Sequence, residues 1–252
     1  MFVGTSPDGD DAEAEMALEH SIRSRATQPV DFCWMRLTRE PSSPWFSDGK
    51  GGGWDTKSWV TPFSGFRWRI PEVCAHKGRA IYMDVDMLCV TDIAELWEMP
   101  MPKGACVLAR EAKRYCVMLI DCKEAGRHNP FLSVRRRSGG AVAPFPPGQN
   151  WNCLDGDGLP LSDPSIKLLH FTSIDSQPHL PLARARLVKE GRKHWYDGPV
   201  RPHWRQELMT LWHREYDAGL ASGLTLKGRR GKELFGPFPK RALTVYSGLR
   251  PS

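Results

Sequence analysis

The stretch that decides the fold is Ala80-Ile81-Tyr82-Met83-Asp84-Val85-Asp86-Met87-Leu88, in which two aspartates interrupt an apolar, strand-forming run. Side chains two residues apart in an extended chain point to the same side, so Asp84 and Asp86 present their carboxylates together at the edge of a buried sheet. Two like charges this close repel each other and are costly to desolvate unless a cation or strong hydrogen-bond donors lie between them, and a divalent metal is the simplest explanation. Oxygen ligands of this kind suit magnesium or manganese. The stretch therefore predicts a divalent metal site and chemistry on a phosphorylated substrate.

Strand-like and helix-like segments alternate around this stretch, which predicts an α/β domain with a mixed sheet. The expected strands are residues 2–5, 30–37, 79–83, 104–110, 115–121 and 166–171. The expected helices are residues 11–25, a short one within 61–73, a turn at 91–97, and 202–221. Residues 39–59 and 126–164 are rich in Pro and Gly and are expected to be loops, the first long enough to indicate a functional role.

The composition is that of a globular protein with one large domain, or one domain with a small extension: 252 residues, 40% hydrophobic and 25% charged. No apolar run approaches the roughly 18 residues that a membrane span requires. The first 20 residues are acidic, unlike a secretory leader, so a cytoplasmic location is expected. The seven cysteines are odd in number and lack Cys-x-x-Cys spacing, which favours reduced thiols over disulfides or a structural zinc site.

The net charge of +6 arises largely in the second half of the chain, in the arginines at 135–137 and in a basic tail. The tail cations are Lys227, Arg229, Arg230, Lys232, Lys240 and Arg241. Such runs are usually solvated surface, although they also suit an anionic substrate or a peripheral contact with an acidic membrane. Nucleic acid is not expected as a partner, because no recognised binding motif accompanies the charge.

Three further segments place polar side chains near the predicted metal site. His170 ends the strand-like run 166–171, where it is either a structural residue or a third metal ligand that suits manganese. Arg67 lies just upstream of the aspartates and either faces solvent or reaches a nucleotide. Gly4, Thr5 and Ser6 end the first strand, and ligands of α/β sheets gather at the carboxyl ends of strands.

The order of these motifs resembles glycosyltransferase family 8 and its bacterial relatives. The resemblance covers about residues 1–185 and includes IPE, GRAIYMDVDMLCVTDIAELW, CVMLIDCKE, NWNCLD and LLHFTSIDSQPHLP. It implies one GT-A-type catalytic domain with a Rossmann-like mixed sheet flanked by helices, followed at residues 186–252 by a helical extension and the basic tail. It also implies transfer of a sugar from a nucleotide diphosphate sugar, usually a uridine diphosphate (UDP) sugar, to an acceptor hydroxyl with retention of anomeric configuration.

The same resemblance assigns roles to individual residues. Asp84, Asp86 and His170 would hold manganese, with magnesium as the alternative. Donor contacts would come from Gly4, Thr5 and Ser6 beside the nucleobase, from Arg67, Asp84 and Val85 near the nucleotide or donor sugar, and from Gln177 near the diphosphate. No protein nucleophile is evident, and the acceptor is left open among glycans, lipid-linked sugars and proteins.

Two departures from the family pattern keep a second hypothesis open. Gln177 stands where the family often has a lysine facing the diphosphate, and a neutral donor makes a weaker hydrogen bond than a charged one. The Asp-Gln segment that usually precedes the Trp-Asn pair is not evident between Lys123 and Asn150. Both departures suit a catalytically degenerate protein that binds a nucleotide sugar without transferring it.

Two other interpretations of the acidic motifs fit less well. A HAD-type phosphatase also uses Asp-x-Asp after an apolar strand, but its motif lies near the start of the chain and is followed by Thr or Val where Leu88 stands. Residues 8–19 and 155–166 imitate calcium-binding loops, but the first lacks the central glycine and the second lacks the closing glutamate. Both segments are expected to be turns.

Overall fold

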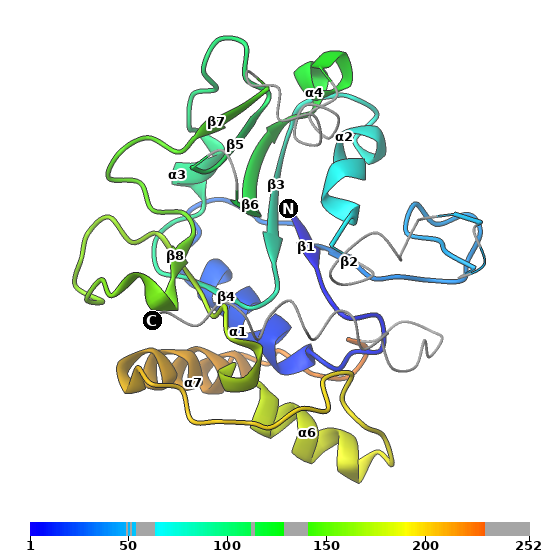
Figure 1. Cartoon of the computed structure of the whole chain (residues 1–252), viewed down its shortest axis with the longest axis vertical. Helices are drawn as coiled ribbons and strands as arrows, with labels where there is room; N and C mark the ends of the chain where they lie inside the picture. Colours follow the sequence, from blue (N-terminus) through cyan, green and yellow to red (C-terminus); the bar gives the residue numbers. More distant parts are fainter. Residues whose placement is uncertain (49, 51, 54–63, 112–113, 129–140, 230–252) are drawn as a thin grey trace.

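The computed structural model describes residues 1–48, 50, 52–53, 64–111, 114–128 and 141–229. Parts of the expected loops 39–59 and 126–164, the start of the segment 61–73, the arginines at 135–137 and the tail after Arg229 lie outside these residues. The described chain forms a six-stranded mixed sheet of order β2-β1-β3-β6-β5-β7, with helices on both sides (Figure 1). This is the α/β architecture that the sequence predicts.

The sheet brings several strand ends to one edge. β1 (Phe2–Gly4) lies parallel to both β2 (Cys33–Met35) and β3 (Arg79–Asp84). β6 (Arg114–Asp121) runs antiparallel to β3 and to β5 (Val107–Arg110), which lies parallel to β7 (Val142–Pro144). The carboxyl ends of β1, β3, β5 and β7 therefore meet at one edge, where ligands of α/β sheets gather.

The side chains of β3 alternate between two cores, as expected for a strand covered on both faces. Ile81 and Met83 pack in the core that α1 (Ala12–Arg23) covers. Ala80 and Tyr82 pack in the opposite core, beneath the helices η1, α2 and α4. These three helices are η1 (Phe66–Arg69), α2 (Ile70–Val73) and α4 (Cys122–His128). A further short helix, α3 (Ala94–Trp97), precedes β5 in the chain. This burial on both faces fixes the register that carries Asp84 to the sheet edge.

A second, three-stranded sheet extends from the end of β3. It consists of β4 (Met87–Cys89), β9 (Leu168–His170) and β8 (Cys153–Leu154), with β9 in the middle. Its core contains Phe171 together with Leu208 and Trp212 of α7 (Gln206–Ala221), and α7 also packs against α1. Because Met87 pairs with His170, the turn between β3 and β4 brings the histidine beside the aspartates.

Between the expected strand 166–171 and the expected helix 202–221, the structure has two helices that the sequence analysis does not predict. η3 (Ile174–Ser176) and α6 (Leu180–Lys189) lie there. Pro181 falls in the first turn of α6, where a helix does not need the missing N–H, so this proline starts the helix rather than breaking it. The expected loop 126–164 likewise contains β7, β8 and η2 (Asp155–Asp157). The expected boundary after residue 185 falls inside α6.

All seven cysteines are free thiols, as predicted. No helix in the described part of the chain combines the length and apolar character needed to cross a bilayer.

Candidate functional site

Asp84 ends β3 and is held by two donors from the same side of the sheet. Its Oδ1 atom accepts hydrogen bonds from Arg67 Nη2 at 3.1 Å and from the Tyr82 hydroxyl. The guanidinium of Arg67 also lies over the Tyr82 ring, 4.7 Å from its centre, and donates to the carbonyl of Tyr115. Arg67 therefore lies beside Asp84 and neutralises part of its charge.

Asp86 follows in the turn between β3 and β4, with Val85 buried between the two aspartates. Asp86 Oδ2 accepts a hydrogen bond from Gln177 Nε2 at 2.7 Å. Its Oδ1 atom is buried, has no hydrogen-bond partner and lies 3.5 Å from His170 Nε2. A buried carboxylate oxygen without a donor is costly, so this atom fits a bound cation.

His170 presents one particular nitrogen to the aspartates. Its Nδ1 atom lies 2.9 Å from Asn152 Oδ1, which can only accept, so Nδ1 carries a proton. In the neutral ring Nε2 is then unprotonated and faces Asp86, the arrangement typical of a metal-binding histidine. Burial lowers the pKa of His170, but the charges of Asp86 and Asp84 outweigh burial and raise it. The two carboxylates therefore favour positive charge beside this ring.

Asp84, Asp86 and His170 thus lie close together, and two neighbours that the sequence analysis does not name lie beside them. Asn152 lies in the NWNCLD segment, whose sequence alone gives no sign that it orients His170. Cys116 of β6 forms a group of potential ligand atoms with Asp84 and His170, all within 4.8 Å of one another. Burial and the nearby Asp84 raise the pKa of the Cys116 thiol.

The expected nucleobase residues lie at the same edge, at the end of β1. Gly4 pairs with Asp84 in the register of β1 and β3, and a Cβ atom at Gly4 would lie only 2.8 Å from the Tyr82 hydroxyl. Thr5 and Ser6 are buried. The Thr5 hydroxyl donates to Glu15, and Ser6 Oγ accepts from the Asp11 backbone N–H. Both hydroxyl oxygens therefore bond within the protein.

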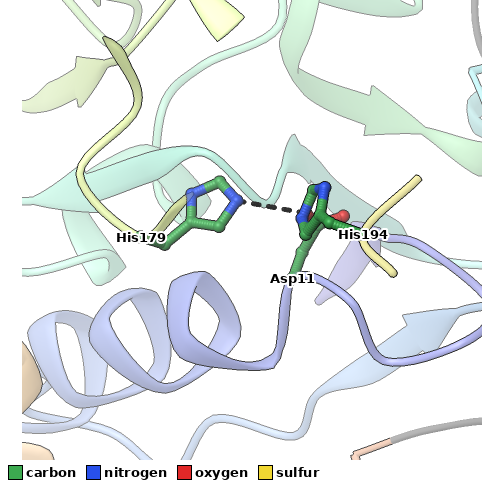
Figure 2. A group of neighbouring side chains, drawn as sticks. All are labelled: Asp11, His179 and His194. Atoms are coloured by element: carbon green, nitrogen blue, oxygen red, sulfur yellow. Dashed lines mark hydrogen bonds and ion pairs between the residues drawn. The ribbon is translucent and has the colours of Figure 1, made fainter. Parts of the chain in front are cut away.

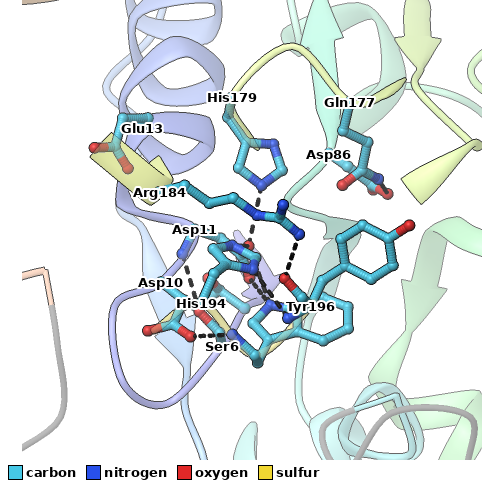
Figure 3. Close-up of polar contacts among 12 residues, drawn as sticks. Ser6, Asp10, Asp11, Glu13, Asp86, Gln177, His179, Arg184, His194 and Tyr196 are labelled. Atoms are coloured by element: carbon cyan, nitrogen blue, oxygen red, sulfur yellow. Dashed lines mark hydrogen bonds and ion pairs between the residues drawn. The ribbon is translucent and has the colours of Figure 1, made fainter. Parts of the chain in front are cut away.

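Gln177 is also engaged within the protein. Besides its bond to Asp86, Nε2 donates to the carbonyl of Phe171 at 2.9 Å. Figure 3 shows the Gln177 side chain beside Asp86, close to His179. Gln177 thus orients a predicted metal ligand, and both hydrogens of its amide nitrogen are used.

A second cluster of potential ligands joins the loop after β1 to the chain around α6. Asp11, His179 and His194 are all buried, and Figure 2 shows both rings turned towards the carboxylate. His179 Nε2 lies 3.1 Å and His194 Nε2 3.4 Å from Asp11 Oδ1, and the indole N–H of Trp195 lies 3.3 Å away. Burial alone would raise the pKa of Asp11, but the two histidines hold it far below its usual range.

The protonation of His194 argues against a metal ion in this second cluster. His194 Nδ1 accepts the backbone N–H of Tyr196 at 3.0 Å, so the proton of the neutral ring must be on Nε2, the atom that faces Asp11. A metal on Nε2 would require removing that proton while Nδ1 stays unprotonated. We therefore interpret the cluster as a buried anion that is hydrogen-bonded by His179 and the Trp195 indole, with His194 Nε2 close by.

Comparison with known proteins identifies the fold. A model described as "Glycosyl transferase family 8" matches residues 55–131, which include Asp84 and Asp86. The apo structure of WbbM, a bifunctional glycosyltransferase, is similar with a TM-score of 0.53 at 12% identity, covering 85% of this chain and 49% of that one. The glycosyltransferase GlyE of Streptococcus pneumoniae TIGR4 has a TM-score of 0.50 at 12% identity, covering 92% of this chain and 66% of GlyE. No curated protein matches the sequence.

These similarities confirm the predicted resemblance and fold class. Residues 55–131 resemble glycosyltransferase family 8, and the fold of the described chain is the GT-A fold.

Proposed function

Because the chain has a GT-A fold and matches family 8 over its central segment, we propose that it is a metal-dependent glycosyltransferase. It would move a sugar from a nucleotide diphosphate sugar, in our proposal a UDP sugar, to an acceptor hydroxyl with retention. The observation that carries the proposal is the meeting of Asp84, Asp86 and His170, with a buried Asp86 oxygen that lacks a hydrogen bond.

The residues of the site would have different roles in binding a charged donor. Asp84, Asp86 and His170 would hold manganese or magnesium, which supplies positive charge for the leaving diphosphate. Asn152 keeps His170 Nε2 directed at Asp86, and Gln177 fixes the Asp86 carboxylate. Arg67 remains close to Asp84 and can turn towards a phosphate or sugar hydroxyl, since a guanidinium has five N–H donors.

The donor and the acceptor would lie at the same edge of the sheet. Gly4, Thr5 and Ser6 would shape the nucleobase end of the site, with Gly4 keeping space beside Tyr82. A cavity of about 320 Å³ lies at the ends of β5 and β7 and is lined by Arg110, Phe145 and Asn150, among others. Its position on the edge that carries Asp84 makes it our candidate for the acceptor.

The proposal is tested by calorimetric titration of UDP with and without manganese. Manganese should strengthen UDP binding to the parent protein, and Asp86→Ala should abolish that gain while circular dichroism shows an intact fold. His170→Ala should reduce it less. Asp92→Ala, which removes an exposed carboxylate bonded to Thr27, is the matched control and should bind like the parent. UDP affinity in Asp86→Ala equal to that of the parent with manganese would contradict the site.

A second candidate function is donor binding without transfer. Gln177 replaces the expected lysine and is fully engaged with Asp86 and Phe171, while Arg67 already neutralises Asp84. Incubation with a panel of nucleotide sugars and manganese distinguishes the two functions. Release of the nucleoside diphosphate supports the transferase, whereas tight binding of intact donors across the panel supports the binding protein.

A further inference from the structure

The proposed metal site contains a sulfur atom that the Asp-x-Asp and histidine motifs do not explain. Cys116 is half-buried on β6, and its Sγ lies within 4.8 Å of a carboxylate oxygen of Asp84 and a ring nitrogen of His170. The pairing of the strands brings it there, because Val117 of β6 lies opposite Met83 of β3, and Cys116 and Asp84 are their chain neighbours.

Three kinds of ligand atom therefore surround one point of the site: carboxylate oxygen, imidazole nitrogen and sulfur. Oxygen and nitrogen alone suit manganese, whereas thiolate ligands favour zinc and other thiophilic metals. Beyond the effect of burial, two aspartates raise the pKa of the Cys116 thiol, Asp84 more than Asp86, and the nearby Arg67 offsets part of this effect. A divalent cation is the group that would make this arrangement of two carboxylates and a thiol favourable.

We propose that Cys116 is a sulfur ligand of this site, which then binds zinc-like cations more strongly than its oxygen and nitrogen ligands alone would allow. The inference rests on the metal-dependent function proposed above and adds a ligand to it. On binding, the S–H bond of Cys116 breaks, a sulfur–metal bond forms, and the proton leaves to solvent, since a coordinating thiol is deprotonated.

Cobalt(II) tests the ligand directly, because cobalt bound by a thiolate absorbs in the near ultraviolet and cobalt bound only by oxygen and nitrogen does not. The parent protein should develop this band during cobalt titration, and Cys116→Ser and Cys116→Ala should not. Cys122→Ser is the control, because Cys122 is a buried thiol beside Cys74, just after the opposite end of β6, and is not one of the potential ligands of this site. It should keep the band.

The affinities for two metals provide the second readout. Cys116→Ser should weaken zinc binding by about tenfold or more while changing manganese binding much less. An unchanged cobalt spectrum and zinc affinity in both Cys116 variants would overturn the inference and leave the manganese site intact. Absence of metal binding to the parent protein would overturn both this inference and the proposed function.

Discussion

At the scale of single residues, the site depends on side chains that orient the ligands. Asn152 is the clearest case, because its carbonyl oxygen accepts the Nδ1 proton of His170 and so leaves Nε2 directed at Asp86. Its own Nδ2 group is buried without a hydrogen-bond partner. An unpaired buried Nδ2 group lowers the stability of the folded protein. The presence of Asn152 is therefore better explained by its orientation of His170 than by a contribution to stability.

Asn152→Ala should therefore lower manganese affinity by about 10–100-fold, the range typical for loss of a residue that supports a metal-binding histidine. Asn152→Asp should retain the affinity, since it keeps an acceptor for Nδ1, removes the unpaired Nδ2 donor, and adds a negative charge that favours a proton on Nδ1. Calorimetric titration of manganese in the presence of UDP measures both. Equal losses in the two variants would show that Asn152 acts through packing alone.

Asp10 gives a prediction for the pH dependence of stability. Burial, followed by the charge of neighbouring Asp11, raises the pKa of Asp10 to about 6, although Arg192 lies 2.9 Å away. Between about pH 4 and pH 6 the folded protein then binds more protons at Asp10 than the unfolded chain does, so the free energy of unfolding falls as the pH rises through this window. The loss attributable to Asp10 is about 2–3 kcal/mol at most.

Asp10→Asn should remove this decrease, because the amide keeps an acceptor for the backbone N–H of Trp195 but does not titrate. Urea unfolding at half-unit steps between pH 4 and pH 7 measures the slope. Parallel curves for the parent and the variant would assign the pH dependence to other groups.

At the scale of elements, local patterns predict the structure well only where one face or both faces of a long segment are buried. β3, β6, α1 and α7 are predicted nearly to their ends, because their periodicity is strong. β7 and β8 have two or three residues each and are held by pairing with distant strands, so no local signal marks them. The same limit explains the site: Asp84, Asp86 and His170 stand in recognisable motifs, whereas Cys116 and Asn152 reach it only through long-range pairing.

The contact between β1 and β3 offers a test at this scale. Gly4→Ala should destabilise the protein by about 1–3 kcal/mol, because the new methyl group meets the hydroxyl of a fully buried Tyr82. It should also disturb the Tyr82 bond that orients Asp84. In a Tyr82→Phe background, which lacks that hydroxyl, the same substitution should cost less. A double-mutant cycle from urea unfolding measures this coupling, and purely additive costs would contradict it.

At the scale of the whole molecule, the acidic N-terminal loop and the basic chain around α6 hold each other in place. Arg186 donates to Glu13 at 2.7 Å and to the carbonyl of Gly9, and Arg192 bonds Asp10. Part of the positive charge in the second half of the chain therefore forms ion pairs within the protein and is not available to bind an anionic partner. The C-terminal segment up to Trp195 is thus part of the structure that supports the end of β1.

Asp11 joins the N-terminal loop to the chain around α6 through its bonds to His179 and Trp195, so removing its carboxylate tests this contact directly. Figure 3 shows Asp11 beside His179, which lies two residues after Gln177 and so joins the loop to the residue that holds Asp86. Asp11→Ala should lower the free energy of unfolding by about 3 kcal/mol or more, because it leaves buried ring N–H groups without an acceptor. It should also weaken manganese-dependent UDP binding, since Gln177 loses its anchored neighbour.

Asp92→Ala is the matched control for this test, because Asp92 accepts a comparable set of bonds from Thr27 and Ala94 but is exposed. It should cost only about 1 kcal/mol, as expected for loss of a cap at a helix start, and leave UDP binding unchanged. Urea unfolding and calorimetry on the same samples measure both effects. If Asp11→Ala destabilised the protein no more than Asp92→Ala, Asp11 would not hold the N-terminal loop to the chain around α6. If Asp11→Ala lowered stability but left UDP binding unchanged, the role of Asp11 would be confined to folding.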